Sequence, residues 1–175
     1  MKHKQTWLQA VLAIAIVGGF AGLSYLWNDA AGSWYMLLKK PVFQPPDQIF
    51  PYVWGALYLL TAGALFMLFR AGAGARAIYP LVLTLALGAL WNYAFFGRQN
   101  PAAGVAVLAL TVSANIYAVW QSYRIKPLYG FLILPLLIWQ TYSGAKLYHL
   151  HAKLSAPFHT GKNKAALRIK GAGEG

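Results

Sequence analysis

Residues 34–58 read WYMLLKKPVFQPPDQIFPYVWGALY, a stretch in which a proline-rich segment gives way to an aromatic helix. Its prolines lack an amide donor and disfavour a helical conformation in the residue before each of them. We therefore expect an ordered loop of about fifteen residues here, and connections of this length are often functional. Its many aromatic residues argue against disorder. Trp54 and Tyr58 are four residues apart and share one face of the helix that follows.

On both sides of this stretch the sequence is that of a membrane protein. Of the 175 residues, 59% are hydrophobic and 10% are charged, a balance far from that of soluble domains. Five apolar runs are long enough to cross a bilayer as helices, at residues 7–27, 49–69, 77–96, 101–120 and 129–150. The predicted fold class is an all-α membrane protein, a bundle of five transmembrane helices with a long structured first loop. Short joins between the later helices predict that consecutive helices are antiparallel neighbours.

Two regions are expected, a membrane domain over residues 1–152 and a basic, flexible tail over residues 153–175. The formal charge is +12, but the Lys and Arg residues are scattered over loops and tail with few stacking aromatics nearby. A nucleic-acid partner is therefore not expected. Anionic lipid headgroups of the bilayer account for the charge more simply. Because the cations divide almost evenly between the two sides of the membrane, they do not predict its orientation.

The residue inventory excludes several classes of enzyme. There is no Cys, so no disulfide, thiolate metal site or cysteine nucleophile can form. The acidic residues Asp29, Asp47 and Glu174 all lie outside the predicted spans, which argues against general acid/base hydrolysis and against intramembrane acidic relays. No phosphate-binding loop or metal-binding helix motif is found, so no catalytic residue and no metal ligand are predicted. An aromatic-rich interior remains, which suits a flat apolar ligand.

Polar residues at membrane depth form a second group of candidates. Asn92 and Asn115 are expected to face the bundle interior, where each either bonds another helix or contacts a ligand. In the last span, Trp139, Tyr142, Ser143 and Lys146 form one mixed stripe at helical spacing. Lys146 is near the end of that span, so its ammonium either extends to the interface or turns inward as a functional group.

The aromatic and proline residues of the opening stretch recur in a known order. They are Trp34-Tyr35, Leu38, Lys40-Pro41, Phe43, Pro45-Pro46, Phe50, Val53-Trp54 and Leu57-Tyr58, followed later by Trp91, Phe95-Phe96-Gly97, Pro135 and Trp139. This series resembles the motifs of the TspO/MBR family, the tryptophan-rich sensory proteins that include the mitochondrial translocator protein. The resemblance covers nearly the whole chain except the tail.

The resemblance implies an integral membrane protein of several spans, expected in a bacterial membrane and commonly a homodimer. It implies that the protein is a sensor or carrier that binds porphyrin, haem or sterol-like ligands beneath the first long loop, with a role in regulating tetrapyrrole or pigment metabolism. No obligatory cofactor is implied. Light-dependent porphyrin breakdown through Trp34, Trp54 and Trp139 is the only enzyme activity it suggests. The predicted ligand-binding residues are Trp34, Phe43, Pro45, Pro46, Phe50, Trp54, Tyr58, Trp91, Phe95, Trp139, Tyr142, Ser143 and Lys146.

The chain departs from the family pattern at several positions. Gly88 stands where the family usually has Asn, Leu136 where it has Tyr, and Lys146-Leu147 where it has Leu-Asn. These changes remove polar groups and keep the tryptophans. They leave open an alternative, in which the ligand site has decayed and the chain is an accessory subunit of a larger membrane complex.

Overall fold

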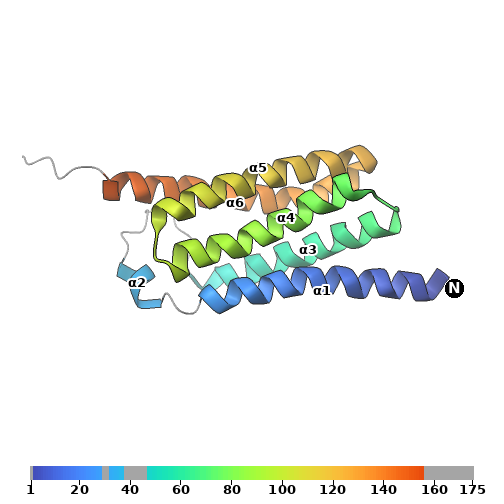
Figure 1. Ribbon diagram of the computed structural model, residues 1–175, viewed down its shortest axis with the longest axis horizontal. Helices are drawn as coiled ribbons and strands as arrows, with labels where there is room; N and C mark the ends of the chain where they lie inside the picture. The colour runs from blue at the N-terminus through green and yellow to red at the C-terminus, as the bar shows by residue number, and fades with distance from the viewer. Residues whose placement is uncertain (1, 29–31, 38–46, 156–175) are drawn as a thin grey trace, which may run out of the picture.

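The structure is a computed structural model that describes residues 2–28, 32–37 and 47–155. All its regular elements are helical. They are α1 (Lys2–Asn28), the short α2 (Gly32–Leu37), the 3-10 turn η2 (Asp47–Ile49), α3 (Phe50–Arg70), α4 (Ala75–Asn92), the π-helical turn η3 (Tyr93–Gly97), α5 (Pro101–Ile125) and α6 (Pro127–Ser155). Five of these helices are long and apolar enough to cross a membrane, which confirms the predicted fold class (Figure 1).

Local sequence sets the ends of these helices. Pro101 begins α5, and the side chain of Asn100 caps it by accepting a hydrogen bond from the amide of Ala103 at 3.0 Å. Residues 71–74 form a tight hydrogen-bonded turn between α3 and α4. Gly72 makes this turn possible because its φ of +63° suits a residue without a side chain. Residues 153–155, the start of the predicted tail, continue α6.

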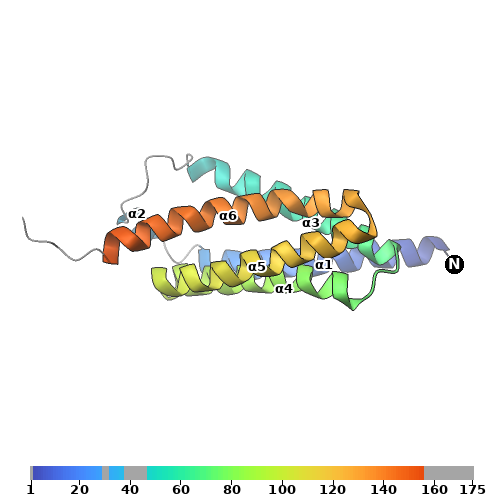
Figure 2. The ribbon, with the colours of Figure 1, turned by 90° about the horizontal axis from the view of Figure 1, so that it is seen from above.

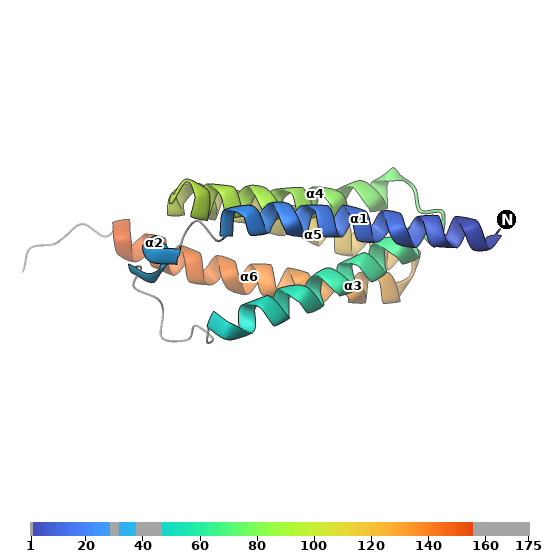
Figure 3. The same ribbon diagram turned by 90° about the horizontal axis from the view of Figure 1, so that it is seen from below.

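The five long helices form a closed ring in the order α1, α4, α5, α6 and α3. Figure 1 and Figure 2 show α5 running alongside both α4 and α6, which are its neighbours along the chain. The expectation of sequential neighbours is wrong for α3 and α4, since α1 packs between them and they touch little. Figure 3 shows the reason: α3 meets α4 at their shared turn and then diverges toward α6.

Two hydrophobic clusters fill the interior of the helix bundle, one toward each end. Near the α3–α4 turn, fully buried aliphatic residues make the main cluster, including Leu65, Leu68, Leu81 and Ile133. At the opposite end a second cluster surrounds Phe95 and Leu108. Many large apolar side chains point outward, as expected of a surface in contact with lipid. A cavity remains between the two clusters.

Candidate functional site

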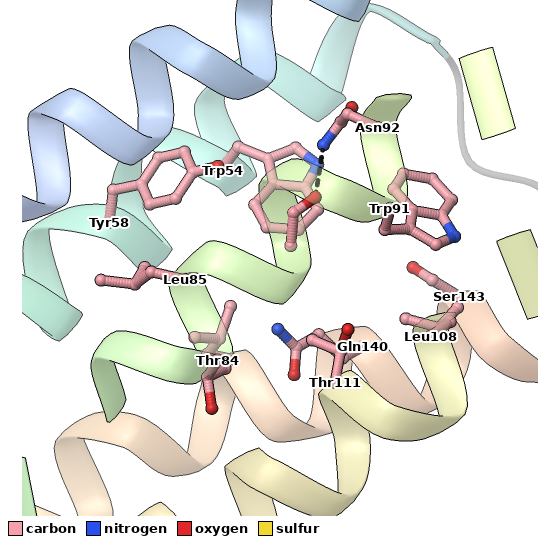
Figure 4. A pocket seen from close by; sticks show the side chains of 12 residues that line it. Trp54, Tyr58, Thr84, Leu85, Trp91, Asn92, Leu108, Thr111, Gln140 and Ser143 are labelled. Atoms are coloured by element: carbon pink, nitrogen blue, oxygen red, sulfur yellow. Dashed lines mark hydrogen bonds between the residues drawn. The ribbon is translucent and has the colours of Figure 1, made fainter. Parts of the chain in front are cut away.

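The cavity lies between α3, α4, α5 and α6 and has a volume of about 40 Å³ (Figure 4). Since a single water needs roughly 10–15 Å³ measured in this way, the cavity has room for a few waters only. A large ligand would have to widen it. The lining residues are Trp54, Tyr58, Thr84, Leu85, Gly88, Trp91, Asn92, Leu108, Thr111, Leu136, Gln140 and Ser143.

One wall of the cavity is aromatic. Trp54 and Tyr58 of α3 both line it, with ring centroids 5.6 Å apart, as their spacing predicted. The Tyr58 side chain is hydrogen-bonded to Ser24 of α1, which ties this wall to the neighbouring helix. Trp91 of α4 lies on another side and stacks on Phe95, with centroids 5.3 Å apart and planes 8° from parallel. The structure therefore places three of the predicted aromatic residues, from two helices, around one cavity.

Behind Trp91, a layer of aromatic rings packs together around Phe95 and Phe96. Trp34 of α2 meets the edge of Phe95 at a centroid distance of 5.4 Å, and Tyr35 meets Phe96 at 5.5 Å. The structure thus places Trp34 against Phe95 rather than among the lining residues. Of the other predicted loop residues, Phe43, Pro45 and Pro46 lie outside the described residues, and so does most of the expected ordered loop.

The opposite wall of the cavity is polar, but most of its hydrogen-bond donors are already paired within the protein. The hydroxyls of Thr84 and Thr111 donate to the carbonyls of Pro80 and Val107 on their own helices, at 2.9 and 2.8 Å. The amide of Asn92 donates to the carbonyl of Gly88, also on its own helix, at 3.0 Å. Asn92 therefore lines the cavity but makes an intrahelical bond, which differs from the expected bond between helices.

Asn115 makes the interhelical bond that the sequence predicted. Its amide nitrogen Nδ2 donates to Oε1 of Gln140, 25 residues further on, at 2.8 Å. Both side chains are buried, with 0% of Asn115 and 5% of Gln140 exposed. The pair joins α5 to α6 beside the cavity.

The cavity-facing stripe of α6 is rotated by about one residue from the predicted one. Leu136, Gln140 and Ser143 face the cavity, so Ser143 is the predicted stripe residue that lines it. Trp139 instead meets the edge of Phe50 at 5.7 Å and lies 5.6 Å from the Tyr142 ring. These three rings join the start of α3 to α6 next to the cavity. The side chain of Lys146 lies outside the described residues.

Two of the positions that depart from the family pattern, Gly88 and Leu136, line the cavity. Sequence reasoning missed several lining residues, which are Thr84, Leu85, Leu108, Thr111 and Gln140. Gln140 carried a usable signal, because an amide within an apolar span needs a partner. Among the described residues, no group of three or more His, Asp or Glu side chains could hold a metal ion.

The fold and the cavity define an all-helical integral membrane protein with five spans and an aromatic chamber at its centre. The chain belongs to the TspO/MBR family, whose model matches residues 10–152. It is 34% identical to the "Tryptophan-rich protein TspO" of Archaeoglobus fulgidus over 139 residues, which cover 78% of this chain and 86% of that protein. It is 31% identical to a "Tryptophan-rich sensory protein" of Cereibacter sphaeroides over 108 residues, 62% of this chain and 68% of the relative.

The similarity extends to animals. The chain is 28% identical to the "Translocator protein" of Bos taurus over 151 residues, which cover 82% of this chain and 89% of that relative. The family model, which matches residues 10–152, includes four of the five spans in full and most of the first, so the resemblance inferred from the motifs is confirmed.

Proposed function

We propose that this protein is a membrane receptor or carrier that binds a porphyrin or a related flat tetrapyrrole in the cavity between α3 and α6. The observation that carries the proposal is the aromatic lining, in which Trp54, Tyr58 and Trp91 converge from two helices. Aromatic rings stack on flat conjugated ligands, and stacking contributes about 1–3 kcal/mol per ring-sized contact. The names of its relatives, sensory and translocator proteins, are compatible with a binding function.

The lining favours a ligand held by its faces over one held through a metal. None of the lining residues is His, Met or Cys, the side chains that most often bind haem iron. Tyr58 is the one phenol in the lining, and its side chain is engaged with Ser24. A metal-free porphyrin is therefore the first probe to test, and haem would bind through the same stacking contacts.

Binding requires the helices to separate, because a cavity of about 40 Å³ cannot hold a macrocycle. The ring of five helices offers a route for this separation. α3 already diverges from α4 along its length, and the edge-on contact between Phe50 and Trp139 joins the start of α3 to α6 beside the cavity. Opening at this end would widen the cavity without breaking the turn between α3 and α4.

The test is a titration of the purified protein in detergent with protoporphyrin IX, read by quenching of tryptophan fluorescence. We expect saturable binding by a protein that elutes as a dimer of this chain. A lack of saturable binding would contradict the proposal. Purification only as part of a larger assembly, without porphyrin binding, would favour the accessory-subunit alternative.

A further inference from the structure

Gln140 presents a hydrogen-bond donor to the cavity because its oxygen is already occupied. Oε1 of Gln140 accepts from Nδ2 of Asn115 at 2.8 Å, and no other hydrogen bond of the Gln140 amide occurs within the described residues. Its nitrogen Nε2 is therefore left with hydrogens to donate. Figure 4 shows the Gln140 amide between Thr84 and Thr111 at the wall of the cavity.

The orientation of the two amides follows from what each arrangement leaves unpaired. In the observed arrangement, the unpaired buried atom of Asn115 is the oxygen Oδ1. Turning both amides over would keep one bond between them but would bury the NH2 group of Asn115 without a partner. An orphaned buried N–H is rarer in proteins than an under-satisfied oxygen, so the observed arrangement is the favoured one. Gln140 thus faces the cavity with its donor.

Several other donors in the lining are already paired. The hydrogens of Thr84 and Thr111 and one of those of Asn92 go to backbone carbonyls of their own helices. A further donor is the buried indole nitrogen Nε1 of Trp91, which has no hydrogen-bond partner among the described residues. A ligand that pairs with this chamber must therefore bring acceptors to it.

We propose that Gln140 is a specificity-determining residue, which selects ligands that carry a carboxylate or carbonyl oxygen at the edge of a flat apolar body. The proposal rests on the proposed function and adds the ligand's edge chemistry to it. A carboxylate is the preferred acceptor, since hydrogen bonds to a charged group are the stronger ones. Asn115 is a positioning residue: by occupying Oε1, it keeps Nε2 directed to the ligand.

The experiment compares two porphyrins that share a macrocycle and differ at the edge. Protoporphyrin IX carries propionates, whereas octaethylporphyrin carries only alkyl groups. Gln140→Met keeps the length of the side chain and removes the donor, so it should weaken protoporphyrin IX binding roughly tenfold or more. Binding of octaethylporphyrin should stay within about twofold of the parent. An equal loss for both ligands would overturn the proposal, because Gln140 would then only shape the cavity.

Two further variants separate selection from folding. Gln140→Met alone leaves Asn115 unpaired, so the double variant Asn115→Leu with Gln140→Met replaces the whole pair by apolar groups, a change that costs less stability than removing one partner. It should fold and show the same selective loss of protoporphyrin IX. Asn115→Leu alone frees the Gln140 amide to rotate, which should lower the ratio of the two affinities while octaethylporphyrin still binds. An unchanged ratio in both variants would contradict the roles given to the pair.

A matched control is Gln121→Met on the neighbouring helix. Gln121 donates to the Tyr117 hydroxyl on the same helix, in an exposed hydrogen bond away from the cavity. Its replacement should change neither affinity. If the parent protein binds neither porphyrin, the proposed function itself fails, and this outcome is distinct from a parent that binds both without distinction, which would overturn only the role of Gln140.

Discussion

At Gly88 the absence of a side chain leaves space at the cavity wall. A Cβ built at this position would meet nothing within 4 Å, and the residue lines the cavity directly. Gly88→Asn restores an amide where the family has one, so it should strengthen binding of neutral, carbonyl-bearing ligands. In the parent we expect an acidic porphyrin to bind better than such a ligand, because its carboxylate pairs more strongly with the available donors. Gly88→Asn should reduce this difference in affinity between the two ligands.

Titration of parent and variant with both ligands checks this expectation. Gly88→Ala is the control, since it fills the same space without an amide and should leave the ratio of affinities unchanged. If Gly88→Asn changes neither affinity, then position 88 does not contact the ligand.

Replacing Trp54 should mainly change porphyrin binding, whereas replacing Trp139 should mainly change stability. Trp54 lines the cavity, so Trp54→Leu should weaken porphyrin binding by about 1–3 kcal/mol, the range for a lost stacking contact. The sequence predicted a ligand contact for Trp139 as well. Its ring packs on Phe50, so Trp139→Leu should mainly lower the unfolding temperature, with a smaller effect on affinity. Fluorescence titration and thermal unfolding separate the two effects.

Trp120→Leu provides the baseline for that comparison, because Trp120 is 50% exposed on the outer face of α5 and lies against Arg124. Trp120→Leu should change neither the porphyrin affinity nor the unfolding temperature appreciably. Equal losses of affinity for Trp54→Leu and Trp139→Leu would mean that the open, ligand-bound cavity extends to Phe50.

Sequence reasoning predicted one half of the cavity lining and not the other, for a reason visible in individual residues. Trp54 and Tyr58 carry a strong signal, since a proline-rich loop fixes where their helix begins. On α6, Trp139 and Gln140 are adjacent, and one residue turns a helix by about 100°. Either of two neighbouring stripes could have faced inward. Which stripe faces inward depends on the partner of Gln140, and that partner, Asn115, lies on a different helix.

At the scale of elements, α5 and α6 are tightly packed at Gly130. A Cβ built there would lie 2.8 Å from Cβ of Tyr123 and 3.1 Å from its Cα. Because backbone atoms cannot move aside cheaply, Gly130→Ala should destabilise the protein by about 1–3 kcal/mol, the usual cost of overpacking. It should also loosen the helix pair that holds Asn115 and Gln140. Thermal unfolding in detergent measures the effect.

Gly144 on the same helix is the control. A Cβ there would meet the Leu108 side chain at 3.7 Å, an ordinary contact. Gly144→Ala should therefore be neutral or slightly stabilising, because alanine favours a helix more than glycine does. A Gly130→Ala variant as stable as the parent would show that the two helices can separate without cost.

The elements themselves were largely predictable, and so was the packing of α5 beside α4 and α6, whereas the separation of α3 from α4 was not. Length and apolarity sufficed to find the five spans, since a helix must cross the whole hydrocarbon layer. The insertion of α1 between α3 and α4 could not be read from loop lengths. A tight turn at Gly72 joins two helices at one end only and leaves them free to diverge beyond it.

For the whole molecule, the ring places basic residues at both membrane faces. The turn between α3 and α4 and the turn between α5 and α6 lie at the same end as the start of α1 (Figure 1). Arg70, Arg76, Arg124 and Lys126 flank these two turns, and Arg98 lies at the opposite end, between η3 and α5. Charge therefore does not fix which end faces the cell interior, but the relative sides of these residues are fixed by the fold.

Because the chain has no cysteine, single cysteines can be introduced to test this arrangement. Arg76, Lys126 and Arg98 are all exposed, so each can be replaced by Cys with little effect on packing. In sealed vesicles of known orientation, a membrane-impermeant maleimide should either label both Arg76→Cys and Lys126→Cys or label neither. Arg98→Cys should be labelled only in the orientation in which those two variants are not. The reason is that α4 crosses the membrane once between positions 76 and 98, and α5 crosses back before position 126. Full labelling of all three after detergent lysis is the control, and labelling of positions 76 and 98 from the same side would contradict the five-span ring.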